Sequence, residues 1–155
     1  MRTLTLWKRS LTVPPLPWGV AIASIVVLSA CGGGEPGGGR DASFPDEPLM
    51  VATGALDHAR VTVWSDPQPL ERGPNTLRLK LEDLSGTPLA NLDVKVEPWM
   101  PAMGHGGPSL PEVIERGEGL YDVPNVALPM PGSWELRIIL SGGVDDHFVL
   151  DVEVP

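Results

Sequence analysis

Alternation of apolar and polar residues is the feature that most constrains the fold of this 155-residue chain. The clearest example is Leu77–Glu82, in which leucines alternate with charged residues. Side chains in a strand point alternately to the two faces of a sheet, so the pattern predicts a strand with one buried and one solvated face. The same pattern predicts strands at 92–97, 134–138 and 148–154.

Weaker alternation predicts three more strands, at 60–64, 112–115 and 119–126. Prolines from Pro67 to Pro131 fall between these runs or at their edges, where a missing N–H is tolerated. Seven short strands in about a hundred residues, without sustained helical spacing, predict an all-β fold. We expect an immunoglobulin-like antiparallel β-sandwich, with a half-open barrel as the alternative.

Residues 1–30 have the character of an export signal, with basic Lys8 and Arg9 followed by an apolar run over 19–28. The following Leu-Ser-Ala-Cys sequence, ending at Cys31, resembles the bacterial lipobox. This resemblance implies cleavage before Cys31, lipidation of its new N-terminus and, with Gly32 next, an outer-membrane location facing the periplasm. The alternative is an uncleaved anchor with an incidental cysteine.

Residues 31–48 contain two glycine triplets with acids and prolines between them, and few apolar side chains. This composition predicts a flexible tether that leads into a domain over 49–155. From Cys31 onward, eight basic residues face 20 acidic ones, a formal charge of −12. Such a balance argues against nucleic acid as a partner and is compatible with cation binding.

The segment 99–107 holds the residues that most directly suggest chemistry, namely Met100, Met103 and His105. Thioether sulfur and imidazole nitrogen are soft or borderline donors that suit Cu(I) better than Zn(II) or Mg(II). Trp99 in the same loop and Trp134 further along are candidates to cover a bound cation. The competing interpretation is that both methionines fill the end of the sandwich.

Strand order adds a fourth candidate ligand, because successive antiparallel strands place alternate loops at opposite poles. The loop after the third predicted strand holds Met100, Met103 and His105, and the loop after the fifth holds Met130. We therefore expect these four residues at one pole. The remaining histidines, His58 and His147, are expected at the other pole, facing solvent.

The order and spacing of several short motifs resemble the YtkA-like domain of bacterial exported proteins, which is related to the FixH family. These motifs are the loop that begins Trp99-Met100-Pro101 and ends in His105, the Gly119-x-Tyr121 segment, and Met130–Leu136. The resemblance covers roughly residues 55–155. It implies an immunoglobulin-like fold, a non-enzymatic role and kinship with small periplasmic copper-handling β proteins.

The sequence thus predicts a lipid-anchored envelope protein that binds Cu(I) and serves copper handling for a membrane partner such as an oxidase or exporter. The alternative is a metal-free interaction module that uses the same loops as a docking patch. An enzyme is not expected, because no nucleophile motif is present. Adjacent Asp145 and Asp146 would point to opposite faces of a strand and are predicted to form a solvated turn.

Overall fold

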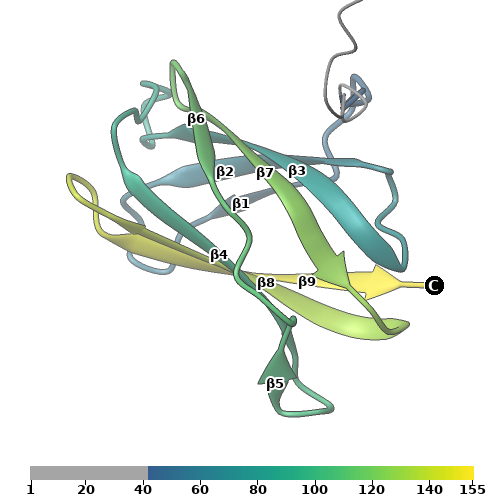
Figure 1. Cartoon of the computed structure of the whole chain (residues 1–155). Coiled ribbons are helices and arrows are strands. Elements are labelled where there is room, and N and C mark those ends of the chain that lie inside the picture. The colour runs from purple at the N-terminus through teal and green to yellow at the C-terminus, as the bar shows by residue number, and fades with distance from the viewer. Residues whose placement is uncertain (1–41) are drawn as a thin grey trace, which may run out of the picture. The chain divides into compact units, whose positions relative to one another are not determined.

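The computed structural model describes residues 42–155, which form two antiparallel sheets packed face to face (Figure 1). The signal, Cys31 and the glycine triplets lie outside the described residues. Within residues 42–155 there is no helix of the length and hydropathy needed to cross a membrane. The strands are β1 Met50–Thr53, β2 Arg60–Asp66, β3 Gly73–Glu82, β4 Asp93–Met100, β5 His105–Gly106, β6 Ile114–Gly117, β7 Leu120–Leu128, β8 Gly132–Ser141 and β9 Asp146–Val154.

The two sheets have the strand arrangement of an immunoglobulin-like sandwich. One has the order β1-β2-β3-β7-β6 and the other the order β5-β4-β8-β9. Without β1 and β5, these sheets reproduce the four-plus-three division of a constant-type immunoglobulin domain, with all seven strands in the same chain order. The predicted fold class is confirmed, and the seven predicted strands correspond to β2, β3, β4, β6, β7, β8 and β9.

The alternating residues that predicted the strands form the core between the sheets. Leu77, Leu79 and Leu81 of β3 are fully buried, and the charged residues between them lie on the outer face. On the facing sheet, β8 buries Leu136 and Ile138 in the same way. Burying these apolar side chains is the main favourable contribution to folding, and the period of two decides which face receives them.

The β8–β9 turn contains a buried carboxylate where the sequence predicted a solvated turn. Asp146 is only 3% exposed, although its neighbour Asp145 is exposed as expected. Its two oxygens accept hydrogen bonds from four backbone N–H groups, those of Leu56 at 2.9 Å, His58 at 3.0 Å, Ala59 at 3.0 Å and His147 at 2.8 Å. Asp146 thereby fixes the β1–β2 loop to the start of β9.

Gly54 makes this arrangement possible, because a Cβ atom at position 54 would overlap the Asp146 carboxylate. Burial raises the pKa of Asp146, but the hydrogen bonds from the four N–H donors lower the pKa by more. The net pKa therefore lies below the ordinary value. The carboxylate is therefore ionised in the folded domain at neutral pH. Its role is structural, since both oxygens are occupied by backbone donors.

The last residues of the predicted tether contact the outer face of the five-stranded sheet. The Phe44 ring stacks on the guanidinium of Arg78, with 4.4 Å between the guanidinium carbon and the ring centroid. The Ser43 N–H donates to Asp66 at 3.1 Å, and the Gln68 side chain donates to the Glu47 carbonyl at 3.0 Å. Residues 43–47 therefore belong with the folded domain.

Candidate functional site

The predicted ligand loop is a β-hairpin that joins β4 to β5. Met100 ends β4, residues 101–104 form the turn, and His105 begins β5. The Met100 carbonyl accepts hydrogen bonds from Met103 N at 3.1 Å and Gly104 N at 3.0 Å, which closes the turn. Gly104 has a φ of +67°, a conformation that other residues adopt at a cost. Figure 1 shows this hairpin projecting from the sandwich.

Met100 and His105 are direct cross-strand partners in this hairpin. Directly opposed residues in an antiparallel pair place their side chains on the same face, with Cβ atoms about 4.5–5.5 Å apart. For Met100 that face is the inner one, because it continues the buried series of Val94, Val96 and Pro98. His105 therefore lies at the rim of the core, on the same side of the sheet as Met100.

The His105 ring contacts a backbone carbonyl. Its Nδ1 lies 2.9 Å from the Gly106 carbonyl oxygen, which can only accept a hydrogen bond. This contact favours the neutral tautomer with the proton on Nδ1, in which Nε2 keeps a free lone pair. This pattern, Nδ1–H bonded to a backbone carbonyl with Nε2 free, is common for histidines that bind metal ions.

Met130 lies on the neighbouring loop, between β7 and β8. The register of β4 with β8 pairs Trp99 with Glu135, which brings the start of β8 beside the end of β4. A Cβ atom built on Gly132 would lie 3.3 Å from the Met100 Cε, so the end of the Met100 side chain adjoins this loop. Met130 is partly buried against the core. The Met100 end of β4, its partner His105 and the Met130 loop therefore occupy one pole.

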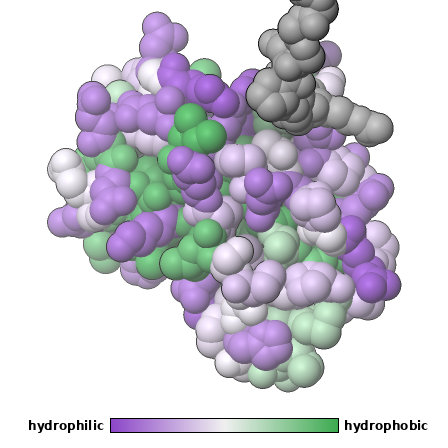
Figure 2. All heavy atoms as spheres, viewed as in Figure 1, coloured by the Kyte–Doolittle hydropathy of each residue, from purple (hydrophilic) through white to green (hydrophobic). Residues whose placement is uncertain are grey.

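The three methionines differ in exposure. Met100 is only 8% exposed and belongs to the core, whereas Met103, in the turn, is 56% exposed. In Figure 2 the loop around β5 carries white and pale-green atoms of intermediate hydropathy, with a hydrophilic patch among them. The pole thus combines one buried, one partly buried and one exposed thioether with an exposed imidazole.

The two tryptophans lie differently with respect to this pole. Strand alternation directs Trp99 to the outer face, away from Met100, and the Arg137 guanidinium already lies over its ring at 4.4 Å. Trp134 is 1% exposed within the core, and its Nε1–H donates to the Met130 carbonyl at 3.0 Å. Trp134 therefore holds the Met130 loop in place.

The remaining histidines lie at the opposite pole and are exposed, as predicted. The His58 Nδ1 lies 2.9 Å from the Asp145 carbonyl, and His147 opens β9. Within residues 42–155, no group of three or more His, Cys, Asp and Glu side chains is arranged to hold a metal ion.

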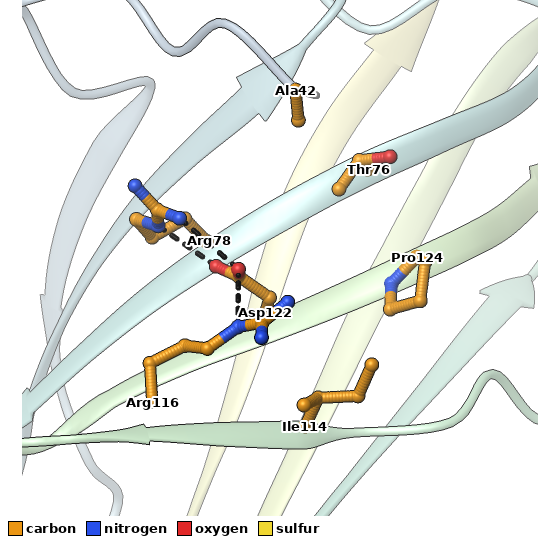
Figure 3. Close-up of a pocket in the computed structure, with 7 residues that line it drawn as sticks. All are labelled: Ala42, Thr76, Arg78, Ile114, Arg116, Asp122 and Pro124. Carbon is orange, nitrogen blue, oxygen red and sulfur yellow. Dashed lines mark hydrogen bonds and ion pairs between the residues drawn. The ribbon is translucent and has the colours of Figure 1, made fainter. Parts of the chain in front are cut away.

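A second polar cluster, absent from the sequence-based expectations, lies on the outer face of the five-stranded sheet (Figure 3). Asp122 of β7 accepts hydrogen bonds from Arg78 of β3, through Nε at 2.8 Å and Nη2 at 3.0 Å. It also accepts one from Arg116 Nε of β6 at 2.9 Å. Burial raises the Asp122 pKa, but its bonds to the arginines outweigh this effect, and the pKa is lowered overall. The only sequence signal for this cluster is the lone acid between Tyr121 and Val123.

Comparisons with known proteins place the chain in a sequence family. Among curated proteins, none matches the chain. One similar solved structure is the Lin-41 filamin domain, at 17% sequence identity and a TM-score of 0.38, with 73% of this chain and 98% of that chain covered. The YtkA-like family matches residues 55–138, which run from before β2 into β8 and include all four predicted metal ligands. The chain therefore belongs to the YtkA-like family.

Proposed function

We propose that this protein binds Cu(I) at the pole formed by the β4–β5 hairpin and the β7–β8 loop. The ligands would be the sulfur atoms of Met100, Met103 and Met130 and the Nε2 atom of His105. The observation that carries the proposal is the state of His105: its Nδ1–H is bonded to Gly106, and its cross-strand partner is Met100.

The chemistry of these donors supports copper in its reduced state. Thioethers are neutral and bind without losing a proton, and with a neutral imidazole they suit a soft monovalent ion. A sulfur site of this kind withstands an oxidising compartment, where free thiols form disulfides. With two ligands on the exposed hairpin and two packed at the core, the site would exchange metal readily and suit a carrier.

The cellular part of the proposal rests on the sequence. Lipidation at Cys31 would anchor the domain to the envelope, facing the periplasm and on the outer membrane. There the domain would hold Cu(I) for a membrane copper protein such as an oxidase or exporter. Mass spectrometry of the N-terminus of the protein isolated from membranes tests the anchor. A chain that begins at Met1 would refute it.

Anaerobic titration of the purified protein against a chromophoric Cu(I) chelator tests the site itself. The test variant is Met100→Leu/Met103→Leu/His105→Gln, in which leucine preserves the volume of the buried Met100 side chain. Met50→Leu on β1 is the matched control, because Met50 is a partly buried methionine on a different strand. We expect the triple variant to lose at least about tenfold in affinity, and the control to match the parent. Equal affinity of the triple variant and the parent would refute the copper proposal.

A second candidate function is a metal-free docking patch on the same hairpin. It is favoured by the exposure of two large apolar side chains near the hairpin, Met103 at 56% and Leu110 at 65%. Such side chains are typical anchors for a protein partner. Crosslinking in intact cells separates the two functions. A docking patch would retain its partner in the Met103→Leu/His105→Gln variant, and a copper-dependent contact would lose it.

A further inference from the structure

A pocket beside Asp122 is a further feature that suggests binding. It has a volume of about 460 Å³ and lies on the outer face of β3, β7 and β6. Its polar lining consists of Thr76, Arg78, Arg116 and Asp122. The apolar walls are Ala42, Ile114 and Pro124. Figure 3 shows Asp122 between the two arginines, with the terminal nitrogens of Arg116 on the side that faces Ile114 and Pro124.

The charge of this cluster is unusual for the domain. Residues 42–155 carry seven basic and 18 acidic side chains, so acidic partners are in excess. Lys80 and Arg137 each pair with a single carboxylate, whereas Arg78 and Arg116 share Asp122. Among the ion pairs of the described residues, this is the one place where two cations meet one acid. The pocket therefore keeps one positive charge without a partner.

The spare hydrogen-bond donors belong mainly to Arg116. A guanidinium has five N–H donors, and Arg116 uses only Nε within the described residues, on Asp122. That bond leaves the two Nη groups available. Arg78 is held in place on both sides, by Asp122 and by the Phe44 ring. Arg78 is thus positioned before any ligand binds, which lowers the entropic cost of binding.

We propose that this pocket binds the carboxylate of a small organic acid that carries a short apolar group. The planar Nη pair of Arg116 matches the two oxygens of a carboxylate. The walls formed by Ala42, Ile114 and Pro124 suit an apolar substituent, which a bare inorganic anion lacks. This site is separate from the β4–β5 hairpin and independent of copper binding.

The test is an NMR titration of the full chain, following the arginine Nε–H signals at constant ionic strength. Propionate is the probe, propionamide is its uncharged analogue, and inorganic phosphate is the anion without an apolar group. We expect propionate to shift the Arg116 and Arg78 signals saturably, with a dissociation constant on the order of millimolar. Propionamide should give no saturable shift, and phosphate should bind several-fold more weakly than propionate.

Arg116→Gln is the test variant, and Arg60→Gln is the control, because Arg60 is an exposed arginine on β2 that does not line the pocket. Propionate should bind at least about tenfold more weakly to Arg116→Gln and unchanged to Arg60→Gln. Non-saturable shifts, equal shifts with propionamide, or undiminished binding to Arg116→Gln would each overturn the proposal. If phosphate binds more tightly than propionate, the assignment to organic acids is wrong. The comparison of propionate with propionamide uses the parent protein and does not depend on the variant folding.

Discussion

Asp146 should be one of the most important side chains for the stability of this domain. Replacing it with alanine removes the acceptor of four backbone N–H groups, at distances of 2.8 to 3.0 Å. A buried donor left without a partner costs about 1–3 kcal/mol. The four losses are not additive, because water can enter the space that the carboxylate leaves. We therefore expect Asp146→Ala to reduce the free energy of unfolding by about 3–6 kcal/mol.

Such a loss is a large part of the roughly 5–15 kcal/mol that stabilises a typical domain. Urea denaturation, followed by tryptophan fluorescence, measures it. The matched control is Asp145→Ala, because Asp145 is exposed and its side chain makes no hydrogen bond within the described residues. The control should change stability by less than about 0.5 kcal/mol. The reasoning is refuted if Asp146→Ala costs less than about 1 kcal/mol relative to that control.

The ionisation of Asp146 adds a pH dependence to the same prediction. Its pKa is lower in the folded state than in the unfolded chain, where an aspartate has a pKa of about 3.9. The unfolded state therefore binds the proton more readily, and this contribution to stability is complete above the unfolded pKa. It is lost as the pH falls through the lower, folded pKa. Denaturation between pH 7 and pH 2 should show a steeper acid loss in the parent than in Asp146→Asn.

Three further predictions concern other side chains of the domain. Gly54→Ala should reduce the free energy of unfolding in urea by more than about 2 kcal/mol, because its Cβ would overlap the Asp146 carboxylate. Gly143→Ala should cost less, since its nearest neighbour is a leucine methyl carbon at 3.3 Å. Asp122→Asn should flatten the acid dependence of stability below pH 4, because the Asp122 pKa is also lowered in the folded state; an unchanged pH profile would contradict this. Trp134→Phe removes the hydrogen bond to the Met130 carbonyl and also leaves a cavity in the core, so it should cost more than about 1 kcal/mol in urea denaturation. It should also shift the Met130 methyl signal in NMR spectra, with the Met50 methyl signal as the unaffected reference.

The strands could be predicted wherever a strand has one buried and one solvent-exposed face. The pattern of Leu77–Glu82 predicts β3, because every second residue is buried in the core. β1 was not predicted, because its four residues alternate only between partly buried and exposed positions. β5 has two residues, and its pairing with Trp99 and Met100 defines it. The residue pattern of so short a segment does not predict its strand pairing.

The candidate site could be predicted in its location but not in its details. Strand counting was enough to associate Met130 with the loop that contains Met100. The core position of Met100 agrees with the competing interpretation, in which the methionines fill the end of the sandwich. The extension of β4 to Met100 was not predicted, because Pro98 interrupts the visible alternation after Glu97. The bonds of Asp146 to the β1–β2 loop, and the bond of Arg78 to Asp122, join residues 44 or more positions apart. Adjacency in sequence could not reveal those partners, so a buried anchor resembled a solvated turn.

The β4–β5 hairpin has a consequence for association between copies of this protein. β4 forms one side of its sheet, where unpaired N–H and C=O groups would offer a template for a foreign strand. Pro98 contributes no N–H there, and β5 occupies the positions beside Trp99 and Met100. The rest of β4 presents charged side chains, those of Asp93, Lys95 and Glu97. This edge of the sheet is therefore protected against strand addition. Such protection would limit aggregation at the high local concentrations that a surface-bound protein would reach.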